Sequence, residues 1–255
     1  MNSKRTTGKK IIRRNCHPII DPARAGFTTG FLQSHTVALP GLKNIKKHLI
    51  WYLAGGLFAG FMLLTFFVLL DPLSKIDRKF SEEIQEHHYR VLDQLMKGIS
   101  AFGYMPASAI LVGLTALLLL LFSYKREAFF VLLTALSGLI STFVKFLVNR
   151  SRPAAPLVRV LEKTQQQSFP SGHVQFYIVF FGFLVLLMYQ LKDLPKTLRA
   201  GISGLSLLLI FSVPISRIYL GAHWFTDVLG GFILGLLILL VLAYAYLNVF
   251  VKTKD

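Results

Sequence analysis

The sequence predicts an all-α, polytopic membrane protein with six transmembrane helices in a bundle. Its 255 residues are 54% hydrophobic and only 16% charged, whereas about a quarter of the residues in a soluble domain carry charge. Six segments approach the roughly 20 apolar residues that span a bilayer, and they contain few charges. These segments are 49–70, 104–123, 128–148, 172–190, 198–217 and 224–250.

The first 48 residues differ in composition, with ten lysine and arginine residues and one acidic residue, Asp21. No apolar run in this part is long enough to span a membrane, and the first span lacks a signal-peptide cleavage site. We therefore expect a basic, flexible cytoplasmic tail at 1–48, a membrane domain at 49–250 and a cytoplasmic tail at 251–255. The single cysteine, Cys16, excludes an intrachain disulfide.

The distribution of positive charge predicts the orientation of the spans. If the N-terminus is inside, the inner segments hold 17 of the 28 lysine and arginine residues, as the positive-inside rule requires. The net charge of +16 is then explained by a basic tail beside anionic lipid headgroups. We therefore expect both termini in the cytoplasm, membrane lipids as partners and no nucleic acid.

Two long connections are expected on the outer side. Residues 71–100 place apolar side chains at helical intervals, which predicts one or two amphipathic helices on the outer surface. Two adjacent histidines there, His87 and His88, are expected to be solvated rather than to bind metal, because neighbouring residues on a helix point in different directions. Residues 149–170 contain several prolines and lack a strong periodicity, which predicts an irregular loop.

A set of polar residues lies next to the ends of the third to sixth predicted spans. Because consecutive spans alternate in direction, the junction between spans three and four and that between spans five and six share one side of the membrane. The predicted orientation makes this side extracytoplasmic. Ionisable residues in membrane helices are costly and usually functional. The set comprises Lys145, Arg152, Ser171, Gly172, His173, Arg217, His223 and Asp227.

The chemistry of this set points to phosphate. The lysine and the two arginines carry fixed positive charge and many N–H donors, which suit phosphate oxygens. Ser171 is expected to cap the fourth span, and with Gly172 it offers a hydroxyl and backbone N–H groups to an anion. Asp227 follows His223 by four residues, so on a helix the carboxylate can hold one ring N–H. The other ring nitrogen is then free to attack phosphorus, with His173 as general acid.

Three segments resemble the signature motifs of the type 2 phosphatidic acid phosphatase superfamily. They are KFLVNRSRP at 145–153, PSGH at 170–173 and SRIYLGAHWFTD at 216–227. All three follow the family patterns Lys-x6-Arg-Pro, Pro-Ser-Gly-His and Ser-Arg-x5-His-x3-Asp, in order and at family spacing. The resemblance extends over about 51–250 through the six-helix layout.

The resemblance implies a role for each residue of the set and a reaction that needs neither a metal ion nor another cofactor. His223 would form a phosphohistidine, Asp227 would orient it, and His173 would protonate the leaving group. The phosphate would be bound by the remaining residues: Lys145, Arg152, Ser171, Gly172 and Arg217. The outer site offers one carboxylate among three cations, which is a poor environment for Mg²⁺.

The resemblance also implies a bacterial lipid phosphatase of the inner (cytoplasmic) membrane, with its active site facing outward. Its substrate class would be phosphatidylglycerophosphate, phosphatidic acid, undecaprenyl pyrophosphate or lipid A phosphates. A lipid phosphotransferase with a non-water acceptor remains an alternative, and acceptor-dependent phosphate release would identify it. A non-catalytic lipid transporter or binding protein is less favoured, because its charges are expected near mid-membrane. The sequence carries no indication of oligomeric state.

Overall fold

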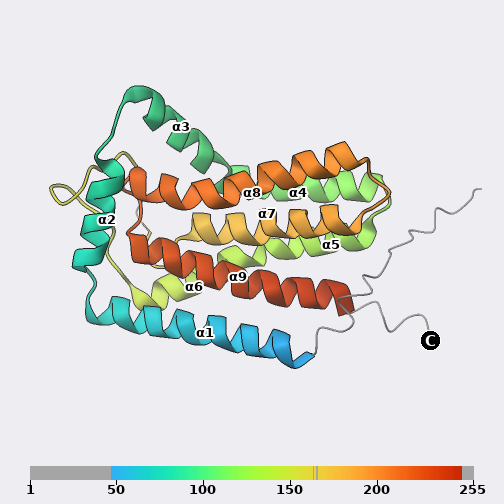
Figure 1. Ribbon diagram of the computed structural model, residues 1–255, viewed down its shortest axis with the longest axis horizontal. Helices are drawn as coiled ribbons and strands as arrows, with labels where there is room; N and C mark the ends of the chain where they lie inside the picture. The colour runs from blue at the N-terminus through green and yellow to red at the C-terminus, as the bar shows by residue number, and fades with distance from the viewer. Residues whose placement is uncertain (1–46, 163, 165, 249–255) are drawn as a thin grey trace, which may run out of the picture. The chain divides into compact units, whose positions relative to one another are not determined.

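The computed structural model describes residues 47–248 except 163 and 165. The predicted tails at 1–48 and 251–255 therefore lie outside the described residues, apart from residues 47 and 48. The described part of the chain is all-helical (Figure 1). Its elements are α1 (Lys47–Leu70), α2 (Lys75–Gln85), α3 (Arg90–Ser100), the short 3-10 helix η2 (Ala101–Gly103), α4 (Ala107–Leu121), α5 (Lys125–Thr134), α6 (Leu136–Val148), α7 (Gly172–Gln190), α8 (Lys196–Tyr219) and α9 (Phe225–Asn248).

Five helical segments of the described chain are long and apolar enough to cross a membrane: α1, the continuous pair α5 and α6, α7, α8 and α9. A sixth exists if α3 and α4 form one span, although the chain bends by 57° between them. α4 alone has 15 residues, fewer than the roughly 20 that a span needs. The bend falls near Pro106, which has no N–H to continue a helix. A polytopic all-α protein is thus confirmed, with five or six spans.

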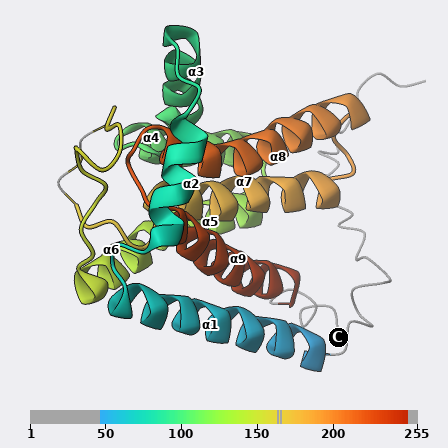
Figure 2. The same ribbon diagram turned by 60° about the vertical axis from the view of Figure 1, so that its left-hand side comes forward.

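The segment 71–100 forms two helices, α2 and α3. The hydroxyl of Ser74 caps α2 by accepting the backbone N–H of Asp77 at 3.2 Å. α2 lies across the ends of α8 and α9, and α3 packs against α8 (Figures 1 and 2). His87 and His88 are exposed, as expected, but they lie in the turn between the two helices rather than on one.

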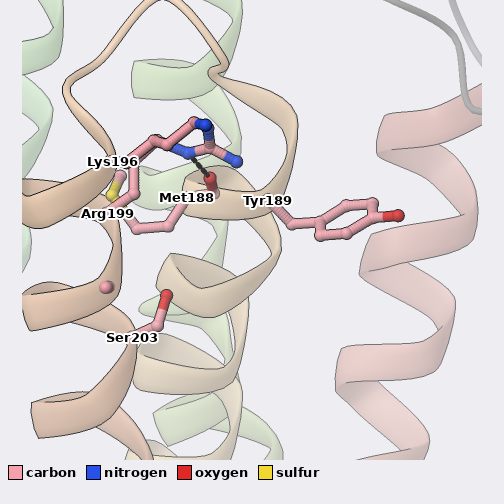
Figure 3. A pocket seen from close by; sticks show the side chains of 6 residues that line it. Met188, Tyr189, Lys196, Arg199 and Ser203 are labelled. Carbon is pink, nitrogen blue, oxygen red and sulfur yellow. Dashed lines mark hydrogen bonds between the residues drawn. The ribbon is translucent and has the colours of Figure 1, made fainter.

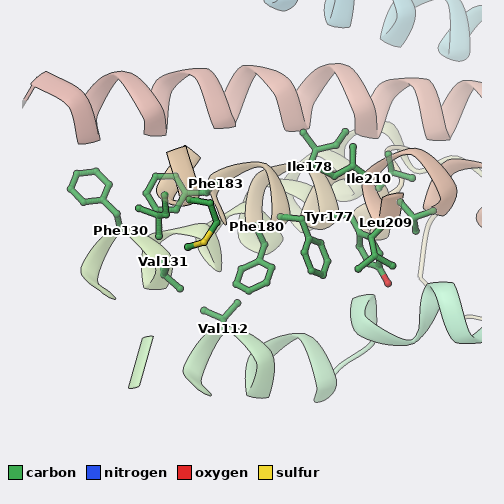
Figure 4. Close-up of a cluster of buried hydrophobic side chains, with 14 of the residues drawn as sticks. Val112, Phe130, Val131, Tyr177, Ile178, Phe180, Phe183, Leu209 and Ile210 are labelled. Carbon is green, nitrogen blue, oxygen red and sulfur yellow. The ribbon is translucent and has the colours of Figure 1, made fainter. Parts of the chain in front are cut away.

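α7 is the most buried of the candidate spans and packs most extensively against α8 and α9. Aliphatic and aromatic side chains together form this packing (Figure 4). The ring of Phe183 lies 6.2 Å from that of Phe130 in α5 and 5.5 Å from that of Tyr246 in α9. Such aromatic pairs each contribute about 0.5–1.5 kcal/mol beyond area burial. This packing holds in place the first turn of α7, where the PSGH segment ends.

Both predicted junctions meet at one end of the bundle, which α2 covers (Figures 1 and 2). Backbone hydrogen bonds join the loop before α7 to its neighbours. Ser168 N donates to Arg150 O at 2.9 Å, and Leu161 N donates to Leu220 O at 3.0 Å. The end of α6, the start of α7, the end of α8 and the start of α9 therefore lie together at this end of the bundle.

Candidate active site

The start of α7 approaches the backbone of α9 closely. Ser171 N donates to Asp227 O at 2.9 Å. A Cβ atom placed on Gly231 would lie 2.4 Å from Ser171 O, and one on Gly230 would lie 2.5 Å from the ring of Phe169. Any larger residue at either position must shift its neighbours, so these glycines let the PSGH segment sit directly against α9.

Ser171 occupies the N-cap position of α7, but its hydroxyl makes no capping hydrogen bond. The predicted N-cap position of Ser171 is therefore confirmed, whereas the capping hydrogen bond expected of its side chain is absent. Its backbone N–H is already bound to Asp227, as described above. The N–H groups of Gly172 and His173, in the first turn, have no acceptor within the helix. The hydroxyl and these N–H groups together suit an anion.

Lys145 lies in the last turn of α6, is buried, and donates to Gln167 O at 2.8 Å. The helix ends at Val148 because Asn149 adopts a left-handed conformation with φ of 47°, which asparagine tolerates better than most residues. The third predicted span, 128–148, ends at Val148, so its predicted end is confirmed. Lys145 therefore reaches the loop 149–170 from the helix, while Arg152 reaches the site from the loop itself.

Arg152 lies between the loop and the turn before α9. Its Nη1 donates to Ala222 O at 2.6 Å and lies 3.4 Å from His223 Nε2. Burial and the neighbouring positive charge of Arg217 lower the pKa of Arg152 to about 10, so the guanidinium remains charged at neutral pH.

His223 lies in the turn between α8 and α9, because α9 begins only at Phe225. The prediction that His223 and Asp227 share one helix is therefore wrong. Asp227 Oδ2 accepts the backbone N–H of Trp224 at 2.8 Å, as an acidic residue in the first turn does when it closes a helix start. The two residues nevertheless meet, with His223 Nδ1 3.6 Å from Asp227 Oδ2. This distance is beyond a direct hydrogen bond.

His223 is buried, with 2% of its surface exposed. Burial lowers its pKa well below 6.5, and the positive charges of Arg152, Lys145 and Arg217 lower it further. The neutral imidazole is therefore the form present at neutral pH, and its unprotonated nitrogen retains the lone pair that a nucleophile needs.

Arg217, in the last turn of α8, is buried and pairs with Glu162 of the loop. Tyr104 joins this pair: its hydroxyl donates to Glu162 and accepts from Arg217 Nη1 at 3.0 Å. The ring of Tyr104 packs edge-on against His173, with ring centroids 4.5 Å apart. Neither Tyr104 nor Glu162 was predicted as a site residue, because no motif contains them.

Four buried atoms of this cluster have no hydrogen-bond partner among the residues that the structure describes. They are Ser171 Oγ, His173 Nε2, Arg217 Nε and His223 Nδ1. Buried polar groups are nearly always paired, and each one left unpaired costs about 1–3 kcal/mol. All four belong to the predicted set, so the cluster contains polar atoms that could bind an oxyanion.

Arg150 was not predicted as a site residue, yet it is buried beside Asp227. It forms ion pairs of 2.6 Å with Asp227 and with Asp77 of α2. Arg150 could have been predicted, because it lies within KFLVNRSRP, two residues before Arg152. Asp77 could not, because it lies far from every motif in the sequence and only the fold brings it to the site.

A separate hollow of about 350 Å³ lies at the other end of α7 and the start of α8 (Figure 3). Arg199 there donates to Met188 O at 2.5 Å. None of the predicted site residues lines it; its walls are formed by Met188, Tyr189, Lys196, Arg199, Ala200 and Ser203. The polar cluster at the opposite end, and not this hollow, is therefore the candidate active site.

Sequence comparisons identify relatives that are lipid phosphatases. The family model described as PAP2 superfamily matches residues 126–250, which include all three motifs. Phosphatidylglycerophosphatase B of Bacillus subtilis is 32% identical over 192 residues, covering 71% of this chain and 89% of that protein. Lipid phosphate phosphatase delta of Arabidopsis thaliana is 30% identical over 169 residues, covering 61% of this chain and 39% of that protein.

Two crystal structures have a similar fold. The transmembrane PAP2-type phosphatidylglycerolphosphate phosphatase of Bacillus subtilis gives a TM-score of 0.64 at 25% identity, covering 75% of this chain and 94% of that one. Aquifex aeolicus LpxE gives a TM-score of 0.53 at 21% identity, covering 69% and 97%. Together with its apolar helices, these relationships identify an integral membrane protein, and the chain belongs to the PAP2 superfamily of lipid phosphatases.

Proposed function

We propose that this protein hydrolyses a membrane lipid phosphate or pyrophosphate through a phosphohistidine on His223, without a metal ion. One observation carries the proposal: the two ring nitrogens of His223 have opposite surroundings. Nε2 lies 3.4 Å from the guanidinium of Arg152, whereas Nδ1 lies 3.6 Å from the carboxylate of Asp227. A phosphate held by the cations would therefore lie beside Nε2, while the carboxylate stabilises positive charge on the ring.

The phosphate would be held by charge from three directions. Lys145 approaches from α6, Arg217 from α8 and Arg152 from the loop between α6 and α7. At the start of α7, the Ser171 hydroxyl and the N–H of Gly172 would complete the set. Such preorganised donors stabilise the charge that develops on the phosphoryl oxygens in the transition state.

In the first step, His223 Nε2 attacks phosphorus, and the bond to the lipid oxygen breaks with its electron pair on that oxygen. His173 donates a proton to the oxygen, and the dephosphorylated lipid leaves. The bound phosphate's negative charge favours the protonated form of His173 needed for this step. In the second step, a water gives a proton to His173 and attacks phosphorus. Inorganic phosphate is released, and His223 returns to its neutral form.

Phosphatidylglycerophosphate is the first substrate to test, because the Bacillus subtilis relative is named for it. Phosphatidic acid, undecaprenyl pyrophosphate and lipid A phosphates complete the class. We place the reaction at the outer face of a bacterial inner membrane, with both termini inside. The excess of lysine and arginine in the segments at the other side of the bundle supports this orientation.

The decisive experiment uses the purified, full-length protein and measures free phosphate from each of these lipids with no acceptor added. His223→Ala should abolish release and remain folded, whereas the exposed His88→Ala should be normal. Alkaline quenching followed by mass spectrometry should find phosphate on the peptide that contains His223. Activity of His223→Ala equal to that of the original protein would contradict a mechanism in which His223 is the nucleophile. Release that requires an added lipid or sugar alcohol would instead favour a phosphotransferase.

A further inference from the structure

A buried network of charges connects α2 to the histidine. Arg150 forms ion pairs of 2.6 Å with Asp77 of α2 and with Asp227 of α9. The side chains of all three residues are at most 1% exposed. Burying charges is costly unless each one is paired and hydrogen-bonded, so the network has to be complete to be stable.

Arg150 has no donor left for a substrate, since all five N–H groups of its guanidinium are used. Nε and Nη2 donate to Pro72 O at 3.1 and 2.8 Å, and Nη1 donates to Thr226 Oγ1 at 2.7 Å. The two remaining N–H groups bind Asp77 and Asp227. Arg150 therefore acts on Asp227 and not on phosphate.

The two oxygens of Asp227 have different tasks. Oδ1 binds Arg150, whereas Oδ2 accepts from Ser168 Oγ and Trp224 N and faces His223 Nδ1. Because Arg150 holds one oxygen, the other is kept on the side of the histidine. Arg150 thereby sets the direction in which the carboxylate acts.

Asp77 determines the net charge of the network. An arginine paired with Asp227 alone would cancel the negative charge beside His223; a second carboxylate restores a net charge of −1. Asp77 is itself held in place, because its Oδ1 accepts from Thr226 N at 2.8 Å and its Oδ2 accepts from Ser74 Oγ at 2.9 Å. The N-cap of α2 and the start of α9 thus hold the carboxylate of Asp77 on the far side of Arg150 from Asp227.

We propose that Asp77 and Arg150 are positioning residues for the reaction, which together hold the carboxylate of Asp227 in place and directed at His223. This inference depends on the proposed function, in which Asp227 stabilises the phosphorylated ring. Neither residue touches the substrate. Through Asp77, α2 helps to position Asp227, although this helix lies outside all three motifs.

Two substitutions at Asp77 separate charge from packing. Asp77→Asn keeps the size of the side chain and removes its charge, whereas Asp77→Glu keeps the charge and lengthens the side chain. If Asp77 acts by its charge, kcat should fall about 10–100-fold in Asp77→Asn, which is the size of effect known for residues that hydrogen-bond to the ligands of metal sites. Asp77→Glu should then retain more activity than Asp77→Asn. KM and the Ki of inorganic phosphate should change less than about twofold, because substrate contacts are intact.

A double substitution tests whether Asp77 acts through Asp227. Adding Asp77→Asn to Asp227→Asn should cost no further activity, because residues that act as a unit are not additive. Asp93→Asn is the matched control: Asp93 of α3 also pairs with an arginine of the loop 149–170, Arg159, at 2.7 Å. That pair lies outside the network, so kcat should be unchanged.

Several outcomes would overturn the proposal. They are a normal kcat in folded Asp77→Asn, a higher activity in Asp77→Asn than in Asp77→Glu, or full additivity with Asp227→Asn. Failure of Asp77→Asn to fold, while Asp93→Asn folds, would assign Asp77 to stability and would also overturn it. An inactive His223→Ala together with a normal Asp77→Asn would remove this inference alone. An active His223→Ala would instead remove the proposed function.

Discussion

Arg217 of α8 and Glu162 of the loop 149–170 form a two-pronged ion pair. Nη2 lies 2.7 Å from Oε1, and Nη1 lies 2.9 Å from Oε2. A carboxylate bound in this way uses the same fork of donors that a phosphate would use. Burial disfavours the ionised form of Glu162, but the bonds and charge of Arg217 outweigh it, and the pKa of Glu162 lies below its usual value. At neutral pH the carboxylate therefore occupies donors of Arg217 that the proposed function assigns to the phosphate.

Replacing Glu162 by Gln should strengthen phosphate binding. The amide retains the shape of the side chain but loses the charge that holds Arg217. We expect the Ki of inorganic phosphate to fall about 3- to 10-fold, since a charge-assisted bond is worth more than a neutral one by the order of 1 kcal/mol. Phosphate inhibition of turnover measures this directly. The exposed Glu82→Gln makes the same charge change outside the site and should have no effect. A weaker affinity for phosphate in Glu162→Gln would show that the carboxylate assists binding.

Gly231→Ala should damage the site without unfolding the protein. The new Cβ would lie 2.4 Å from the carbonyl oxygen of Ser171, which belongs to the backbone and cannot rotate away. The start of α7 must then move, and with it the proposed phosphate donors. Because small displacements of positioning groups can cost about 100-fold in rate, we expect kcat/KM to fall by that order.

Gly204→Ala provides the matched control for this substitution. Gly204 is also helical, in α8, but a Cβ there would have no atom within 4 Å. Its kcat/KM should stay close to that of the original protein, and thermal melting in detergent should show both variants folded. Equal kcat/KM in the two alanine variants would show that the close approach of α7 to α9 is not needed.

Activity should persist in excess EDTA. The carboxylates near the proposed phosphate position, Asp227 and Glu162, are each bound to an arginine, and the surrounding cations disfavour a further positive ion. Phosphate release with and without EDTA measures this, with a magnesium-dependent phosphatase assayed in parallel to show that chelation is effective. Loss of activity that added Mg²⁺ restores would contradict the proposed mechanism.

The helices and the motif residues could be predicted because each is indicated by residues that are close together in the sequence. The apolar run after Pro170 predicted 172–190, and α7 has these bounds. The end of α6 before Arg152 could also be predicted, since Pro153 disfavours helix at the preceding residue. Lys145 and Arg217 were found in the same way, as charges at the ends of apolar segments.

The partners of these residues could not be predicted, because they depend on contacts between distant parts of the chain. Glu162 lies in a loop without periodicity, and only the fold brings it to Arg217. The expected shared helix for His223 and Asp227 was wrong because a capping bond to Trp224 makes α9 begin after the histidine. Two residues four apart in sequence share a face only if both lie within the helix, and His223 precedes the first residue of α9.

The acid limb of kcat/KM should lie below pH 6.5. Burial and three neighbouring cations lower the pKa of His223 below this value, so its ring loses its proton at a lower pH than an ordinary histidine. The nucleophile is therefore ready at pH 6.5 and becomes protonated only in more acidic solution. NMR of protein labelled with ¹⁵N-histidine can follow this titration without substrate, with His223→Gln identifying the resonances. Removing the nearest charge with Arg152→Ala should raise the pKa, whereas the exposed Arg78→Ala should not. A ring that titrates at or above 6.5 in the original protein would exclude this electrostatic account.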